Sequence, residues 1–153
     1  MLTFRRVPGA RFSERRGIGF LEGHAELSAG SAFDALEDKT SRQFLAFVDQ
    51  FIDCHADIST RYHGYRSKLR YKDCYVFKPR GRRKESRFYG FLWHPQKKTR
   101  ARFELCVLCI HALKNERETD DAELERVLGW LCSTGAQMAI AMEFPDAGEG
   151  GTQ

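Results

Sequence analysis

The sequence predicts an α+β domain in which helices before and after a small antiparallel sheet pack on one of its faces. Apolar residues recur at helical spacing from about residue 31 to residue 54, and again after Thr119. Between these segments lie three short runs rich in aromatic and β-branched residues, each bounded by turn residues, as is typical of strands. With 153 residues and 42% hydrophobic content, the chain is long enough to bury one core.

The first helix is expected to run from Ser31 or Asp34 to Cys54. A break or second start is expected near Thr40 and Ser41, because a hydroxyl at this place could cap the second half. The apolar positions are three or four residues apart and therefore share one face, which is expected to be core. They are Leu36, Phe44, Leu45, Phe47, Val48, Phe51 and Ile52.

The three strand-like runs cover residues 74–78, 87–93 and 103–113. The turn signals at 79–81 and 94–98 are short and contain proline, so both connections are expected to be hairpin loops. Three strands joined in this way form an antiparallel meander.

A second helix is expected after Thr119, capped by Thr119 or by Asp120, which makes a capping-box-like pair with Glu123. Gly135 is expected to end or kink this helix. The apolar segment 136–144 fits either another helix or an edge strand, and periodicity does not decide between them.

Residues 1–30 are expected to be an arm or loop, with a short strand at Leu2–Arg5 as the one possible element. Residues 31–144 would then form the single domain, and the polar, glycine-rich residues 145–153 a disordered tail. The sequence has no run of 18 apolar residues and starts without an apolar leader, so a cytoplasmic protein without a membrane span is expected. Five cysteines without a disulfide-like framework are expected to be free thiols.

Charge is distributed unevenly along the chain. Residues 61–102 carry 15 Lys and Arg against two acids, whereas residues 103–153 carry three basic residues against ten acids. Such a segment favours a phosphate-rich partner, and RNA is the preferred interpretation. The alternative is a solvated basic loop that only keeps the protein soluble.

The densest basic cluster is the run from Lys78 to Arg87, with six basic residues in ten positions at a hairpin. On strands, Lys78 would share a face with Val76, and Arg87 with Tyr89 and Phe91. Guanidinium groups bind phosphate in a forked geometry, and neighbouring aromatic rings could stack a base. The sequence therefore predicts a phosphate site with a stacking surface.

His111 is expected on the face of the third strand that also carries Leu105, Val107 and Cys109. It could serve as a general acid or base, or be a packed histidine with one hydrogen bond. Cys106 and Cys109 have the spacing of a metal knuckle, but on a strand residues three apart point to opposite faces. Buried thiols are therefore expected, with no metal site and no cofactor.

Four segments resemble a known family: Tyr65–Arg70, Asp73–Lys78, Arg87–Leu92 and Leu108–Thr119. They are similar to the approach to the sheet, two strands and the segment before the last helix in RelE/HigB toxins of bacterial type II toxin–antitoxin systems, particularly the phage-related HigB-like branch. The resemblance covers about residues 33–130, and it implies a RelE-like arrangement of helices on a curved antiparallel sheet.

The resemblance implies a metal-independent endoribonuclease that cleaves mRNA at the ribosome and is held by an antitoxin protein. Lys78 and Arg80 would orient the 2′-hydroxyl and the scissile phosphate, and Arg87 would stabilise the charge that develops on the phosphate. His111 would assist proton transfer. Further residues implied in RNA binding are Lys68, Arg70, Arg82, Arg83, Lys84, Lys114 and Arg117.

The chain departs from the family pattern in several places. The first hairpin is enlarged around Arg83, and the tyrosine or acid that some members carry near the C-terminus has no clear counterpart. The missing tyrosine or acid favours the alternative of a non-catalytic RNA- or DNA-binding module or degenerate relative. A third alternative is a gyrase inhibitor of the ParE kind, which shares the fold, because a fold does not fix a function.

Overall fold

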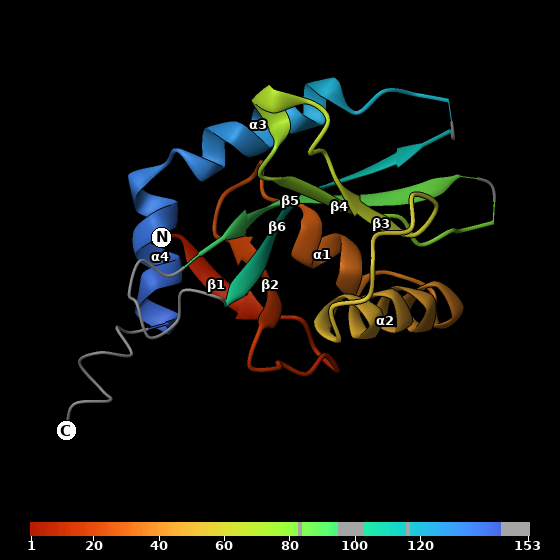
Figure 1. Ribbon diagram of the computed structural model, residues 1–153, viewed down its shortest axis with the longest axis horizontal. Coiled ribbons are helices and arrows are strands. Elements are labelled where there is room, and N and C mark those ends of the chain that lie inside the picture. Colours follow the sequence, from red (N-terminus) through yellow and green to blue (C-terminus); the bar gives the residue numbers. More distant parts are fainter. Residues whose placement is uncertain (83, 95–102, 116, 145–153) are drawn as a thin grey trace.

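The computed structural model describes residues 1–82, 84–94, 103–115 and 117–144. They form a six-stranded mixed sheet in the order β1-β2-β6-β5-β4-β3, with helices on both faces (Figure 1). The strands are β1 Thr3–Arg6, β2 Arg16–Glu22, β3 Tyr62–Gly64, β4 Cys74–Phe77, β5 Glu85–Trp93 and β6 Glu104–Lys114. The helices are α1 Ala29–Asp34, α2 Asp38–Ile52, a 3₁₀ turn at Leu69–Tyr71, α3 Asp121–Leu131 and α4 Thr134–Glu143.

The antiparallel meander expected for the middle of the chain is confirmed as β4, β5 and β6. The sheet as a whole is not purely antiparallel, because β2 pairs in parallel with β6. The α+β class is therefore correct, and the expected purely antiparallel sheet is wrong.

The N-terminal 30 residues are not an arm or loop. The short strand expected at Leu2–Arg5 is present as β1, and it pairs with β2, which lies between β1 and β6 inside the sheet. Strand β2 is not predicted from the sequence, because Gly17 and Gly19 lower the strand propensity of this segment. Gly19 is needed there, since an added Cβ would lie 2.6 Å from the backbone carbonyl oxygen of Arg5 on β1.

The first helical segment is interrupted earlier than expected. Helix α1 ends at Asp34, and Glu37 adopts extended backbone angles before α2 begins, so the break falls at residues 35–37 and not at Thr40–Ser41. Thr40 is buried within α2, where its Oγ1 donates to the carbonyl of Arg80 at 3.5 Å. The hydroxyl thus anchors a loop and does not cap a helix.

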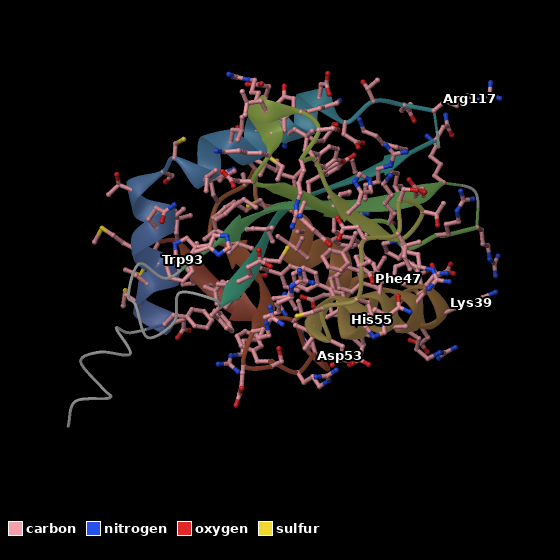
Figure 2. All side chains as sticks on the ribbon, viewed as in Figure 1. Lys39, Phe47, Asp53, His55, Trp93 and Arg117 are labelled. Atoms are coloured by element: carbon pink, nitrogen blue, oxygen red, sulfur yellow. The ribbon has the colours of Figure 1, made fainter. Side chains whose placement is uncertain are left out.

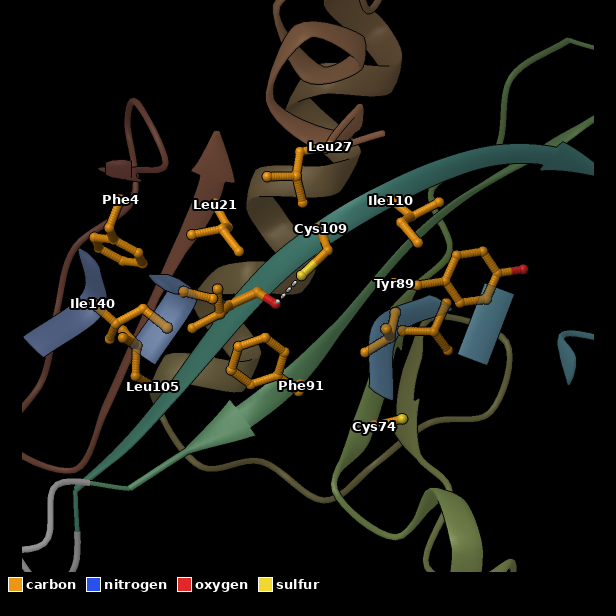
Figure 3. Packing of buried hydrophobic residues seen from close by; sticks show 14 of the residues in the cluster. Phe4, Leu21, Leu27, Cys74, Tyr89, Phe91, Leu105, Cys109, Ile110 and Ile140 are labelled. Atoms are coloured by element: carbon orange, nitrogen blue, oxygen red, sulfur yellow. Dashed lines mark hydrogen bonds between the residues drawn. The ribbon is translucent and has the colours of Figure 1, made fainter. Parts of the chain in front are cut away.

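The sheet separates two hydrophobic cores. Helices α1 and α2 cover one face, where Phe44, Phe51 and Phe77 are fully buried. Helices α3 and α4 cover the other face, which Figure 3 shows from close by with Tyr89 and Phe91 among its labelled residues. The expectation that all helices pack on one face is wrong, and the strands are apolar on both sides because both sides are buried.

A bulge in β6 changes which side chains face which core. The register with β5 shifts between Tyr89 and Gly90, so that Cys109 is an extra residue, and Cys109 and Ile110 both join the α3/α4 core. In Figure 3 the Cys109 thiol donates to the carbonyl of Val107, at 3.6 Å. His111 consequently lies on the α1/α2 face, opposite to the face predicted from simple alternation.

The C-terminal segment forms two helices. Helix α3 begins after Asp120 as predicted but ends at Leu131, and Gly135 lies inside α4 and does not end or kink α3. Ser133 caps α4 by accepting from the Ala136 N–H at 3.2 Å, which decides the open alternative for residues 136–144 in favour of a helix. No helix in the described ranges is long and apolar enough to cross a bilayer.

Candidate nucleic-acid interface

A pocket of about 490 Å³ lies at one end of the sheet, between the β4–β5 connection and the β6–α3 connection. Five basic and two acidic side chains contribute to its wall, so its charge favours an anion. The lining residues are Arg80, Gly81, Arg82, Lys84, Glu85, Lys114, Asn115, Arg117 and Glu118. The structure therefore brings together five of the basic residues that the sequence implicated.

The β4–β5 connection is held firmly against α2. The backbone N–H of Arg80 donates to Gln43 Oε1 at 2.6 Å, and the Arg80 carbonyl accepts from Thr40. Within the connection, the Gly81 N–H donates to the Lys84 carbonyl at 3.2 Å. Arg80 is therefore anchored to α2, and Gly81 and Lys84 are bonded to each other, before any ligand arrives.

The five cations of the pocket differ in how they are engaged. Arg82, Lys84 and Arg117 are exposed and have no partner in the part of the chain that the structure describes. Lys114 is only 13% exposed, and its Nζ contacts Glu123 Oε1 at 2.5 Å. Figure 2 shows Arg117 at the end of the molecule far from α4. Within the pocket wall, Arg82, Lys84 and Arg117 are therefore the cations available to a ligand.

Arg87 lies beneath the pocket and not in its wall. Its side chain is 2% exposed, and Nε donates to Glu85 Oε2 at 2.6 Å. Its Nη1 donates to Asp120 Oδ1 at 2.5 Å and to the Glu118 carbonyl at 3.0 Å, and its Nη2 donates to the Asn115 carbonyl at 2.8 Å. All three nitrogens are thus committed, so Arg87 fixes the β6–α3 connection and does not present its charge to a phosphate.

Asp120 is the main acceptor beneath the pocket. Besides Arg87, the phenols of Tyr89 and Tyr65 donate to its carboxylate, the first at 2.7 Å. Burial alone would raise the pKa of Asp120, but these three donors outweigh it and hold the pKa below its ordinary value. The expected capping box does not form, because the Asp120 side chain makes no cap bond and turns to Arg87 instead.

Lys78 follows the last residue of β4, on the same sheet face as Arg87 and next to it across the strands. It is half-buried, its Nζ donates to the Ser59 carbonyl at 3.3 Å, and burial lowers its pKa. His63 on β3 lies on the same face and is also half-buried, with Nδ1 2.8 Å from the Gly64 carbonyl. Burial lowers the pKa of His63, so the ring is neutral near pH 7.

His111 does not join this group. It lies on the opposite face, where its ring packs on Phe88 at 4.7 Å between centroids and its Nε2 is 3.1 Å from Ser86 Oγ. The backbone N–H of His111 donates to Ser28 Oγ at 2.9 Å. This geometry corresponds to the packed strand-end histidine, and the expected position on the sheet face of Leu105, Val107 and Cys109 is wrong.

Two other basic residues assigned to RNA binding are paired with acids of α3. Lys68 Nζ lies 3.1 Å from Asp121 Oδ1, and Arg70 Nη2 donates to Glu125 Oε1 at 2.7 Å. Their charges are therefore balanced locally. Arg83 and the basic residues of 95–102 lie outside the described residues.

The stacking surface predicted beside the basic cluster is absent from the described part of the site. Tyr89 and Phe91 are fully buried beneath α3, and no aromatic residue lines the pocket. The residues that sequence reasoning missed are Glu85, Asn115, Glu118 and Asp120, which build the frame of the site. The acids that follow the last predicted strand are the available signal, but the sequence pattern assigns Asp120 to a helix cap.

The cysteines behave as predicted from strand geometry. Cys106 and Cys109 belong to different cores on opposite faces of the sheet, and burial raises the pKa of both thiols. Among the described residues, no three His, Cys, Asp or Glu side chains lie close enough together to hold a metal ion.

Comparison of the chain with protein-family models, with curated proteins and with solved structures finds no match.

Proposed function

We propose that this protein binds RNA through the basic pocket between the β4–β5 and β6–α3 connections. The observation that carries the proposal is that Arg82, Lys84 and Arg117, from both connections, converge on one concavity and have no partner in the described ranges. Phosphate is the anion that forked guanidinium groups match best, and nucleic acid is its most abundant polymer.

The frame beneath the pocket strengthens the proposal. Arg87 joins β5 to both Asn115 and Asp120, so the connection that carries Arg117 is held in place by a buried ion pair. The other connection is bonded to α2 through Arg80. Because both connections are anchored, binding of a phosphate has to order only the exposed side chains and not the loops that carry them, which limits the entropy cost of binding.

The direct test is fluorescence anisotropy of a labelled 20-nucleotide RNA titrated with the protein at 50 and 200 mM salt. Binding is expected to weaken steeply with salt, because each neutralised phosphate releases counterions. The triple variant Arg82→Ala, Lys84→Ala, Arg117→Ala should bind at least tenfold more weakly. Arg126→Ala, which removes an exposed cation of α3, is the matched control and should bind as wild type does. Equal binding by the triple variant and wild type would contradict the proposal.

RNA cleavage, as in an mRNA-cleaving toxin, is a second candidate, and the observation that favours it is the pair Lys78 and His63 on one sheet face. A neutral imidazole can accept the proton of a ribose 2′-hydroxyl, and a nearby ammonium can neutralise charge on the attacked phosphate. This assignment moves the chemistry away from Arg87 and His111, whose positions do not suit it.

Cleavage is tested by incubating purified protein with a labelled mRNA, alone and with ribosomes. Shortened products are expected from wild type and not from Lys78→Ala or His63→Ala, whereas His111→Ala should cleave normally. Growth arrest on expression of the protein alone, relieved by a co-expressed partner, would extend the proposal to a toxin with an antitoxin. Intact mRNA in every reaction would leave RNA binding without cleavage.

A further inference from the structure

We infer that the pocket recognises the phosphate backbone of its ligand and not the bases, so that it binds RNA of any sequence and accepts a duplex as well as a single strand. The inference rests on the proposed RNA binding and names its ligand class. The sequence predicts a site that stacks bases on aromatic rings. The positions of the aromatic residues in the structure lead to a different ligand class.

Every aromatic side chain of the protein can be placed. The chain has 12 Phe, five Tyr and two Trp, all within the described ranges, and none of them lines the pocket. Most are buried, and the partly exposed ones are Phe12, Tyr71, Trp93, Trp130 and Phe144. Those nearest the pocket belong to the cores: Phe88 and Tyr89 on β5 are fully buried. Proteins that prefer single strands stack successive bases on exposed aromatic rings, and the pocket wall contains no such ring.

The side chains of the pocket wall also favour contacts with phosphates over contacts with bases. The side chains that line the pocket are cations, two carboxylates and one amide, and both carboxylates are engaged. Glu85 accepts from Arg87, and Glu118 accepts from the Asn115 N–H at 2.5 Å. What remains for a ligand is the positive charge of Arg82, Lys84 and Arg117. Such groups hold phosphates, which are identical at every position of a nucleic acid.

A duplex suits this site at least as well as a single strand. Phosphates are more closely spaced along a duplex, so each neutralised phosphate contributes more to the salt dependence of binding than in a single strand. In other proteins, the stacking of bases on aromatic rings adds to the affinity for a single strand. The pocket wall has no aromatic ring, so this contribution is missing.

The experiment compares a 20-base-pair RNA duplex, one of its strands, and 20-nucleotide homopolymers of U, A and C by fluorescence anisotropy. The homopolymers are expected to bind within about threefold of one another, and the duplex at least as tightly as its single strand. On the duplex, Arg82→Ala, Lys84→Ala and Arg117→Ala should each reduce the slope of log affinity against log salt by about 0.9. Arg126→Ala should leave the slope unchanged.

Two results would overturn the inference, and they are distinguishable. Tenfold preference for one homopolymer, or for the single strand over the duplex, would show that bases are recognised, and RNA binding itself would stand. Absence of salt-sensitive binding to every probe would overturn the proposed function together with the inference.

Discussion

Arg87 is the residue on which the two connections of the pocket depend. It is buried and charged, and it contacts two carboxylates and two backbone carbonyls from different segments. Removing one member of a buried ion pair leaves the other charged in a low-dielectric site, which costs more than the pair itself contributes. Substitution of Arg87 is therefore expected to lower the stability of the fold first, and any loss of function would follow from that.

Arg87→Met is expected to lower the free energy of unfolding by about 3–5 kcal/mol, because Asp120 and Glu85 would lose their cationic partner. Urea unfolding followed by circular dichroism measures this. Arg126→Ala, on the surface of α3, should change it by less than about 0.5 kcal/mol. A fully stable Arg87→Met protein that no longer binds RNA would instead assign Arg87 to the ligand.

Asp120 makes stability depend on acidity. Its pKa is lower in the folded state than the ordinary 3.8, so its ionised form stabilises the fold. This contribution is present above about pH 4 and is lost as the pH falls through the lower, folded value. The difference in unfolding free energy between wild type and Asp120→Asn should therefore be largest near neutral pH and shrink below pH 4. A difference that stays constant from pH 7 to pH 2.5 would contradict this account.

At the scale of elements, the bulge in β6 determines which groups meet. An alternating pattern places His111 with Cys109, but the extra residue reverses the alternation, so Arg87 and His111 face opposite cores. Gly90 stands opposite the bulge, and an added Cβ would lie 2.0 Å from the Val107 carbonyl oxygen. The bulge and the glycine are therefore complementary features of the β5–β6 pair.

Gly90→Ala is expected to destabilise the protein by about 3 kcal/mol, because the backbone of β6 would have to move. Gly129 provides a matched comparison: it lies in α3, and nothing is within 4 Å of the added Cβ. Gly129→Ala should therefore stabilise the protein by about 0.5–1 kcal/mol through helix propensity. Thermal unfolding of both variants measures the two effects, and a Gly90→Ala variant as stable as wild type would contradict the bulge geometry.

Local patterns predicted the elements that have strong local signals. The meander β4–β6 and helix α3 follow from apolar periodicity and turn residues, and both are present. Strand β3 has only three residues, and β2 contains two glycines, so their positions depend on pairing with distant strands. The bulge cannot be seen in a single sequence either, because it is a relation between two strands.

At the scale of the whole molecule, folding redistributes the charge that the sequence displays. Lys68 and Arg70 belong to the most basic segment, yet they meet acids of α3 that are 53 and 55 residues away in the chain. The same acidic region supplies Asp120 to Arg87. The basic pocket was therefore predictable from composition, but its extent was not, because partners so far apart are paired only by the fold.

The N-terminal segment, which the sequence predicts to be an arm, instead places strand β2 inside the sheet. Deletion of residues 1–24 would remove β1 and β2, expose the edge of β6 and uncover both cores. The truncated protein is expected to lose cooperative thermal unfolding and to aggregate. Phe20→Ala tests the same point in the full chain: Phe20 is fully buried, so about 3–5 kcal/mol of stability should be lost, whereas Arg15→Ala in the exposed loop should be neutral. A truncated protein that unfolds cooperatively at the wild-type temperature would show that residues 1–24 are dispensable for the fold.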